Sequence, residues 1–112
     1  VLRTARDAEA LAAYLADPLM QIGRITPALA ASTLAGIERV MHHADDVTLP
    51  LLLLHGLADR VVPADGTIAT HALAGSRDKT LRTYPGAYHH LFLDAVREEA
   101  TRDTLARLAA RS

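Results

Sequence analysis

Two residues that can exchange protons each follow a predicted strand. Asp59 comes shortly after an unbroken run of leucines at residues 51–54, and His89 comes shortly after an alternating segment at residues 79–84. A carboxylate beside an imidazole fixes the tautomer of the ring and stabilises the imidazolium that forms when the other ring nitrogen takes a proton. The two residues therefore predict an acid and a base that would serve a nucleophile.

Two strands joined by a helix must bring Asp59 and His89 together. The leucine run is typical of a strand covered on both faces, and the alternation at 79–84 is typical of an edge strand. Between them, Pro63 opens a helix that Gly75 closes. Such a crossover implies a right-handed parallel pair, with strands about 4.8 Å apart and ligands at their carboxyl ends. We therefore expect Asp59 and His89 to be neighbours in space.

Three further helices are predicted around this pair, which makes the fold class α/β. Asp7 caps a short helix that Pro18 stops, Thr26 begins a helix over residues 27–44, and a final helix covers 94–110. The helix at 27–44 carries one apolar stripe, made of Ala30, Leu34, Ile37, Met41 and Ala44. The helix between the strands is expected to turn Ile68, Ala69, Ala72 and Leu73 inward, and the final helix to carry Leu93, Val96, Ala100, Leu105 and Leu108 near its apolar face.

The composition excludes several classes of function. The 112 residues suit one small globular domain, with 50% apolar and 22% charged residues. A net charge of −1 argues against nucleic-acid partners, and the absence of cysteine excludes disulfide and thiolate chemistry. No apolar run approaches the roughly 18 residues of a membrane span, and no signal-peptide pattern is seen, so a cytoplasmic location is expected. Because the sequence begins with Val1, we expect a processed product or a piece of a longer protein.

Two motifs carry a resemblance to a known family. The segments LLLLHGLADRVVP at 51–63 and YPGAYHHLF at 84–92, with DKTL at 78–81, resemble the C-terminal part of an α/β-hydrolase. The most similar group is the monoacylglycerol lipases and lysophospholipases, often grouped with serine aminopeptidase-like hydrolases. In that family the acid lies in a His/Gln-Gly-x-x-Asp-x-x-Val pattern, which Asp59 matches, and the catalytic histidine lies in a Gly-x-x-His pattern, which His89 matches.

The resemblance implies both an organisation and an activity. Residues 1–46 would form the end of a cap, and residues 47–112 the closing strand-helix-strand-helix part of the hydrolase core. The complete enzyme would hydrolyse a carboxylic ester, a monoacylglycerol or lysophospholipid, through an acyl-enzyme. His89 would act as base and then acid, Asp59 would orient it, and no metal or organic cofactor would be needed.

The nucleophile that the family requires is missing from this sequence. Its G-x-S-x-G elbow is absent, and the three serines, Ser32, Ser76 and Ser112, do not fit the pattern. We therefore expect this chain alone to be inactive, with an acyl ester as the substrate of the complete enzyme only. The first predicted strand would also have an open edge, which predicts self-association.

Other readings of the same residues stay open. His90 could be the base instead of His89, and Asp78 could be the acid, although it precedes its strand and so lies at the wrong end of the sheet. His55 is interpreted as a structural hydrogen-bonding residue at a strand end. A metal cluster could be drawn from His42, His43, Asp45 and Asp46, but adjacent histidines diverge around a helix.

Two other classes of function remain as alternatives. The chain could be a non-catalytic βαβα module that binds a partner or an apolar ligand through the helix at 27–44. A receiver-like phosphoacceptor with Asp59 at the strand end is a weaker alternative, because no acidic pair precedes it and no lysine follows on a suitable strand.

Overall fold

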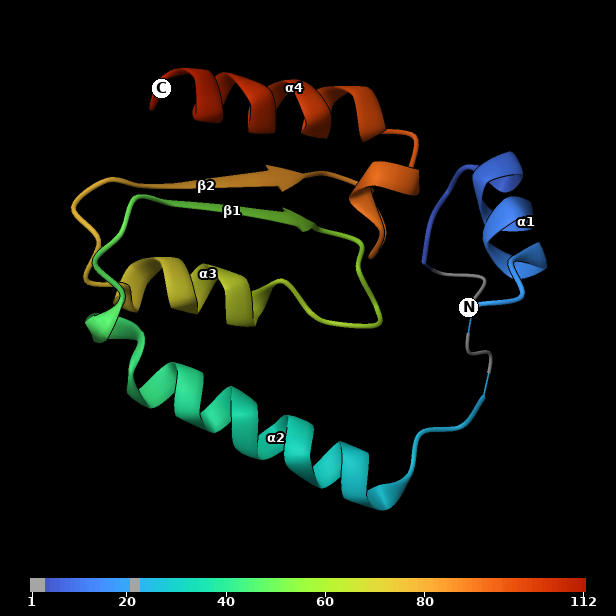
Figure 1. The fold of residues 1–112 in the computed structure, drawn as a ribbon, viewed down its shortest axis with the longest axis horizontal. Coiled ribbons are helices and arrows are strands. Elements are labelled where there is room, and N and C mark those ends of the chain that lie inside the picture. Colours follow the sequence, from blue (N-terminus) through green and yellow to red (C-terminus); the bar gives the residue numbers. More distant parts are fainter. Residues whose placement is uncertain (1–3, 21–22) are drawn as a thin grey trace.

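The computed structural model describes residues 4–20 and 23–112. The predicted elements form in the predicted order (Figure 1). They are α1 (Ala8–Ala16), α2 (Pro27–His42), the 3-10 turn η1 (Ala44–Asp46), β1 (Leu51–Gly56), α3 (Asp65–Leu73), β2 (Lys79–Tyr84), the 3-10 turn η2 (Leu91–Leu93) and α4 (Arg97–Ala109).

The two strands form the parallel pair that the crossover pattern predicted. The register runs from Leu51 opposite Lys79 to Gly56 opposite Tyr84. Helices α3 and α4 lie on opposite faces of the pair (Figure 1). Leu53 faces the groove beside α3, whereas Leu52 and Leu54 face the groove beside α4. The leucine run therefore forms a strand with a helix on each face and half-buried side chains, which confirms the α/β fold class.

The two N-terminal helices begin where the capping residues predicted. Asp7 Oδ1 accepts hydrogen bonds from the amides of Glu9 and Ala10, each at 3.0 Å, and Thr26 Oγ1 accepts one from Leu29 at 3.1 Å. These side chains satisfy first-turn amides that have no partner within the helix. The α2 helix ends at His42 rather than at residue 44, because residues 44–46 tighten into η1.

The last helix begins later than predicted. Residues 91–93 form η2, and α4 begins at Arg97 instead of residue 94. The physical reason is that the Asp94 carboxylate is fully buried and bonded to Arg6 and Tyr88, so it does not cap a helix. Similarly, α3 begins at Asp65 rather than at Pro63.

The buried core is small and lies where β2 meets α4. Its main cluster consists of Tyr84, Ala87, Leu91 and Ala100, against which Leu54 and Val96 pack, and Ala5, Ala44 and Ala74 are buried outside this cluster. The expected inward position was wrong for Ile68 and Leu73, which are 43% and 50% exposed. On the apolar face of the last helix Ala100 is fully buried and Val96 packs against the core, but Leu105 and Leu108 are 59% and 62% exposed. A sheet of two strands is narrower than the apolar stripe of a helix, so it covers only part of each helix.

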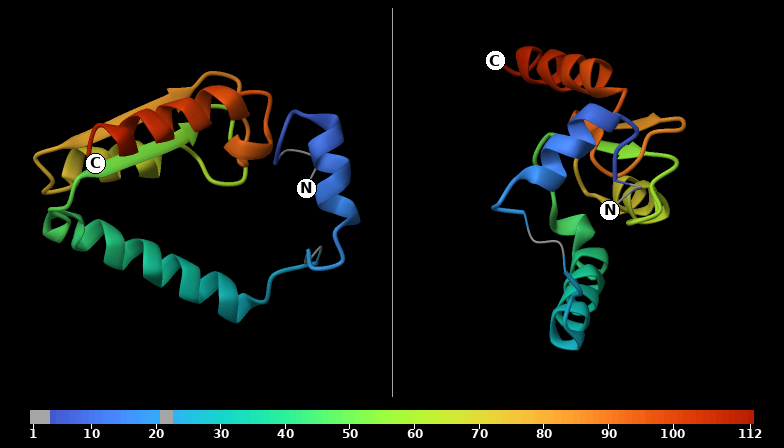
Figure 2. Two further views of the ribbon diagram at one scale, coloured as in Figure 1. Left: turned by 45° about the horizontal axis from the view of Figure 1, so that its top comes forward. Right: turned by 90° about the vertical axis from the view of Figure 1, so that its right-hand side faces the viewer.

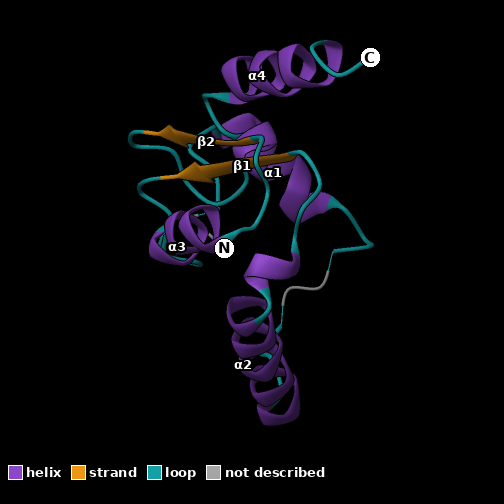
Figure 3. Cartoon of the chain, turned by 90° about the vertical axis from the view of Figure 1, so that its left-hand side faces the viewer, coloured by secondary structure: helices purple, strands orange, loops and turns teal. Residues whose placement is uncertain are grey.

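The α2 helix extends away from the strand pair and packs chiefly against η1 (Figures 2 and 3). Its stripe is largely uncovered, since Leu34 is 64% exposed and Ile37 53%. At the other side of the molecule, α1 lies near η2 and the carboxyl ends of the strands (Figure 1). None of the helices in the described ranges 4–20 and 23–112 has the length and apolarity needed to cross a membrane.

Candidate active site

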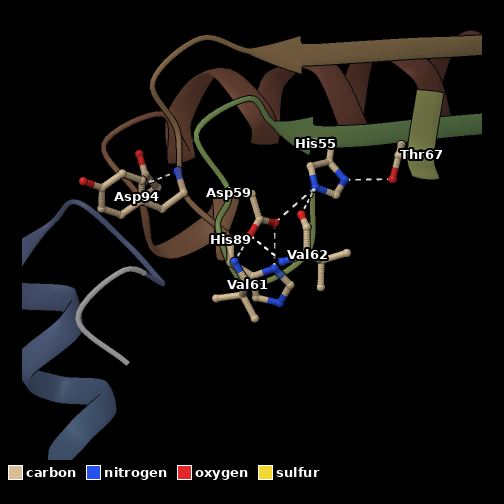
Figure 4. A network of polar contacts seen from close by, with 8 residues as sticks. His55, Asp59, Val61, Val62, Thr67, His89 and Asp94 are labelled. Carbon is tan, nitrogen blue, oxygen red and sulfur yellow. Dashed lines mark hydrogen bonds and ion pairs between the residues drawn. The ribbon is translucent and has the colours of Figure 1, made fainter. Parts of the chain in front are cut away.

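A tight turn after β1 holds the Asp59 carboxylate in place. Asp59 Oδ1 accepts hydrogen bonds from the backbone amides of Val61 and Val62, both at 2.9 Å (Figure 4). The amide of Asp59 itself donates to the carbonyl of Gly56 at 3.2 Å. One carboxylate oxygen is therefore committed to the turn, and the other, Oδ2, is turned toward the loop that follows β2.

The turn after β1 packs directly against the loop after β2. The amide of Leu57 donates to the Tyr84 carbonyl, and that of Ala58 to the Ala87 carbonyl, each at 3.0 Å. Gly56 permits this approach, because a Cβ there would overlap the carbonyl oxygens of Ala87 and Tyr88. Gly56, which ends β1, thus allows the backbones of the two loops to pack directly against each other.

The close approach brings the predicted acid and base into contact. His89 Nδ1 lies 2.8 Å from Asp59 Oδ2, and the side chains are 33% and 2% exposed, respectively (Figure 4). With the carboxylate as acceptor, we assign the proton to Nδ1, which leaves Nε2 as the basic nitrogen. The predicted contact between Asp59 and His89 is therefore confirmed.

The surroundings of Asp59 keep it ionised. Burial alone would raise the pKa of its carboxyl group, but hydrogen bonds from the Val62 amide, His89 and the Val61 amide outweigh burial and hold that pKa below its ordinary value. A carboxylate that stays charged can stabilise an imidazolium on His89. The pair is therefore arranged for transfer of a proton at Nε2.

A second histidine touches the same carboxylate oxygen. His55 Nε2 lies 3.1 Å from Asp59 Oδ2 and 2.8 Å from the Val62 carbonyl, while its Nδ1 lies 2.8 Å from Thr67 Oγ1 (Figure 4). The hydrogen-bonding role expected for His55 is confirmed. Its contact with Asp59 was not predicted, although a histidine ending the strand just before the acid turn was a signal for it.

The alternative acid and base lie in other surroundings. The His90 ring packs against Tyr14, with ring centroids 5.3 Å apart, and its amide donates to the Thr4 carbonyl at 2.6 Å. Burial, together with the neighbouring His89, lowers the pKa of His90. Asp78 lies at the amino end of β2 and pairs with Arg107 and Arg111. The structure therefore brings Asp59 together with His89, and places Asp78 at the opposite end of the sheet.

The remaining candidates are spread over the molecule. His43 Nδ1 lies 3.3 Å from Asp46 Oδ2, and within the described part of the chain no three His, Asp or Glu side chains come together as metal ligands. Ser76 is buried at the amino ends of the strands, where its hydroxyl donates to the carbonyls of Val47 and Leu49. The other serines are Ser32 on the exposed face of α2 and Ser112 beyond the end of α4.

An acid and a histidine on the turns after two neighbouring parallel strands define the closing part of an α/β-hydrolase. Comparison with known proteins identifies the family: the one described as "Serine aminopeptidase, S33" matches residues 3–95. The chain belongs to this family of hydrolases and has the C-terminal part of the fold.

Individual relatives are lipases. The chain is 41% identical over 88 residues to the monoacylglycerol lipase of Mycolicibacterium smegmatis, covering 78% of this chain and 31% of the relative. It is 38% identical over 78 residues to the human monoglyceride lipase, covering 70% and 26%. The crystal structure of Paleococcus ferrophilus monoacylglycerol lipase superposes with a TM-score of 0.90 at 32% identity, over 98% of this chain and 43% of that one. The chain thus spans a quarter to a third of the length of these curated relatives.

Proposed function

We propose that Asp59 and His89 are the acid and base of a Ser-Asp-His triad that hydrolyses carboxylic esters, with a monoacylglycerol or lysophospholipid as substrate. The observation that carries the proposal is the 2.8 Å contact between His89 Nδ1 and Asp59 Oδ2 on turns that follow parallel strands. Similarity to proteins named monoacylglycerol lipase supports the substrate class. No metal or organic cofactor has a role in this proposal.

The proposed mechanism divides the work between this chain and residues outside it. His89 Nε2 takes the proton of a serine hydroxyl as that oxygen attacks the ester carbonyl, and then returns the proton to the leaving alcohol. Asp59 holds the ring in the Nδ1–H tautomer and balances the positive charge on it. The serine and the oxyanion-hole donors are supplied by protein segments that this sequence does not contain, because Ser32, Ser76 and Ser112 lie away from His89.

The same proposal assigns the two parts of the chain. Residues 1–46 form the end of a cap, and residues 47–112 form the strand-helix-strand-helix part of the core. The projection of α2 away from the strand pair and the packing of the core beside β2 support this division.

A chimera tests the proposal directly. This chain replaces the matched segment of the Mycolicibacterium smegmatis lipase, and hydrolysis of a monoacylglycerol is measured. We expect an active chimera in which His89→Gln lowers kcat by at least about 10⁴-fold. A folded chimera without activity, or one that His89→Gln leaves active, would contradict the proposal.

Covalent labelling of this chain alone tests the proposal that its sequence supplies the acid and the base but not the nucleophilic serine. A serine-reactive fluorophosphonate should leave the 112-residue chain unmodified, whereas the active chimera should be labelled in a manner that His89→Gln suppresses. Covalent labelling of the chain alone would show that it carries its own nucleophile.

A second candidate is a non-catalytic module that binds an apolar ligand or partner through α2. The observation that favours it is the exposure of Leu34 and Ile37, and an apolar groove of about 470 Å³ between α2, β1 and α3. A folded but inactive chimera would favour this candidate over the esterase.

We also propose that the isolated chain associates with itself. Within the described residues β1 pairs with β2 on one edge only, so its other edge presents unpaired backbone groups beside apolar side chains. Sedimentation velocity should show species larger than a monomer. A single monomeric species with sharp cooperative unfolding would contradict this proposal.

A further inference from the structure

One fully buried charged group has no role in the chemistry described above. The Asp94 side chain is 0% exposed, and its carboxylate accepts three hydrogen bonds. The Arg6 amide donates to Oδ2 at 2.9 Å, Arg6 Nε donates to Oδ1 at 2.8 Å, and the Tyr88 amide donates to Oδ2 at 3.2 Å. Both oxygens are therefore bonded, and Asp94 connects two segments far apart in the sequence.

The contact with Tyr88 places this carboxylate beside the proposed base. Tyr88 precedes His89 directly, so a bond to the Tyr88 amide fixes the backbone from which the imidazole projects. The loop needs such a restraint, because Gly86 near its start has a φ of +75° and a wide choice of other conformations. Asp59 holds the ring of His89, and Asp94 holds the backbone behind it.

The N-terminal segment supplies the other half of this clamp. Besides the two bonds from Arg6, the Thr4 carbonyl accepts from the His90 amide at 2.6 Å. The neighbouring pair of Asp7 Oδ2 with Arg97 Nη1 ties the same segment to α4 and involves no residue of the His89 loop. Thr4 and Arg6 therefore bond to the chain just after His89, at His90 and at Asp94. Both neighbours of His89 in the sequence are held by these bonds. The Tyr88 amide donates to the charged Asp94 carboxylate, whereas the His90 amide donates to a neutral backbone carbonyl.

The energetics favour a positioning role over simple packing. A buried carboxylate costs free energy unless it is paired and fully bonded, and an apolar side chain of similar size often serves packing equally well. Burial alone would raise the pKa of Asp94, but the bonds from Arg6 and Tyr88 hold it below the ordinary value. The carboxylate is thus kept charged at a point where its directional bonds set the geometry of a loop.

We propose that Asp94, held by Arg6, is a positioning residue that fixes the His89 loop so that Nδ1 of His89 keeps its contact with Asp59. The consequence for catalysis rests on the proposed function, whereas the consequence for geometry does not. The test therefore measures the imidazole of His89 directly.

The experiment reads which nitrogen of His89 carries the proton. The chain is labelled with ¹⁵N-histidine, and the nitrogen shifts are recorded above the titration range of imidazole, in solution or, for an associated sample, in the solid state. His89 is assigned with His89→Gln. Intact chain should show the Nδ1–H tautomer, whereas Asp94→Asn and Arg6→Gln should lose it in favour of the Nε2–H form that an unconstrained imidazole prefers. Arg97→Gln, which cuts the neighbouring ion pair, should keep the Nδ1–H tautomer.

Two variants keep the test decisive. Asp94→Asn removes a wholly buried charge and could prevent folding, but Arg6 is one-third exposed, and its substitution leaves the carboxylate in place. A folded Arg6→Gln or Asp94→Asn chain with an unchanged tautomer would overturn the proposal. Loss of the tautomer in Arg97→Gln to the same extent would also overturn it, because the effect would then belong to general loosening.

The chimera adds a kinetic readout. There Arg6→Gln should lower kcat by about 10²-fold while KM is unchanged, as expected for a displaced catalytic group. A rise in KM with kcat unchanged would contradict positioning of the base. Failure of the proposed function can be told apart from failure of the positioning role. If the chimera is inactive although Arg6 and Asp94 are intact, the proposed function fails, but the tautomer measured in this chain still tests the role of Asp94.

Discussion

The two ends of the strand pair each hold a carboxylate between two basic side chains, but the chemistry differs. At the carboxyl end, Asp59 Oδ2 contacts the imidazoles of His55 and His89 at 3.1 and 2.8 Å. At the amino end, Asp78 pairs with the guanidinium groups of Arg107 and Arg111. A guanidinium group stays charged at any physiological pH, whereas an imidazole exchanges its proton near neutrality. The carboxyl end therefore holds the groups that suit the proposed acid-base role, and the amino end holds a permanently charged cluster.

The two carboxylates also differ in how deeply they are buried. The Asp59 side chain is 2% exposed and Asp78 is 36% exposed. A charge pair in a water-excluded site interacts strongly, whereas one that water reaches contributes little. Arg107 therefore joins α4 to the amino end of the strands through a partly solvated pair, whereas Asp59 holds the His89 imidazole through a buried carboxylate.

The largest difference is expected when each carboxylate is neutralised in the active chimera. Asp59→Asn should lower kcat by about 10⁴-fold, because the amide no longer selects the reactive tautomer of His89. Asp78→Asn serves as the matched control and should leave kcat within about twofold, since Asp78 lies at the opposite end of the strand pair from His89. Steady-state hydrolysis of a monoacylglycerol measures both. Equal losses in the two variants would remove the distinction between the ends of the sheet.

The next largest effect concerns the close approach of the two turns. Gly56→Ala should destabilise the chain by about 1–3 kcal/mol or more, because the added Cβ overlaps two backbone carbonyls that cannot move freely. The control is Gly36→Ala, in the middle of α2 with nothing within 4 Å, which should stabilise by about 0.5–1 kcal/mol. Urea unfolding of the two variants gives the comparison. A neutral Gly56→Ala would show that the turns are not packed as described.

A smaller effect is expected in acid. The pKa of Asp59 is lowered in the folded chain from an ordinary value of 3.8, so the folded state binds its proton less readily than the unfolded chain does. Its contribution to stability is therefore complete above that ordinary value and is lost as the pH falls through the folded pKa. Urea midpoints measured from neutral pH downward should fall less steeply for Asp59→Asn than for the unsubstituted chain. Identical slopes would contradict the assigned environment of Asp59.

Much of this arrangement was predictable from local patterns. The leucine run and the alternation at 79–84 predicted a parallel pair, and from the pair followed the meeting of Asp59 and His89. These signals are strong because strand period, turn residues and the direction of the crossover all act over short stretches of sequence. The same locality explains why Asp7 and Thr26 predicted the helix starts correctly.

The missed features depend on contacts between distant segments. The last helix was predicted to begin at Asp94, yet the Asp94 carboxylate bonds to Arg6, near the other end of the sequence, and the helix begins at Arg97. Ile68 and Leu73 resemble core residues by their spacing, but the width of the sheet decides whether they are covered. The spacing of residues in the sequence predicts neither the partner of Asp94 nor the exposure of Ile68 and Leu73, because both depend on tertiary packing.

The most direct measurement of the central claim is the protonation site of the His89 imidazole in the unsubstituted chain and in Asp59→Asn, read from ¹⁵N shifts. The structure predicts a proton on Nδ1 in the first and loss of that preference in the second. A proton on Nε2 in the folded, unsubstituted chain would contradict the acid-base pair and the hydrolase mechanism built on it.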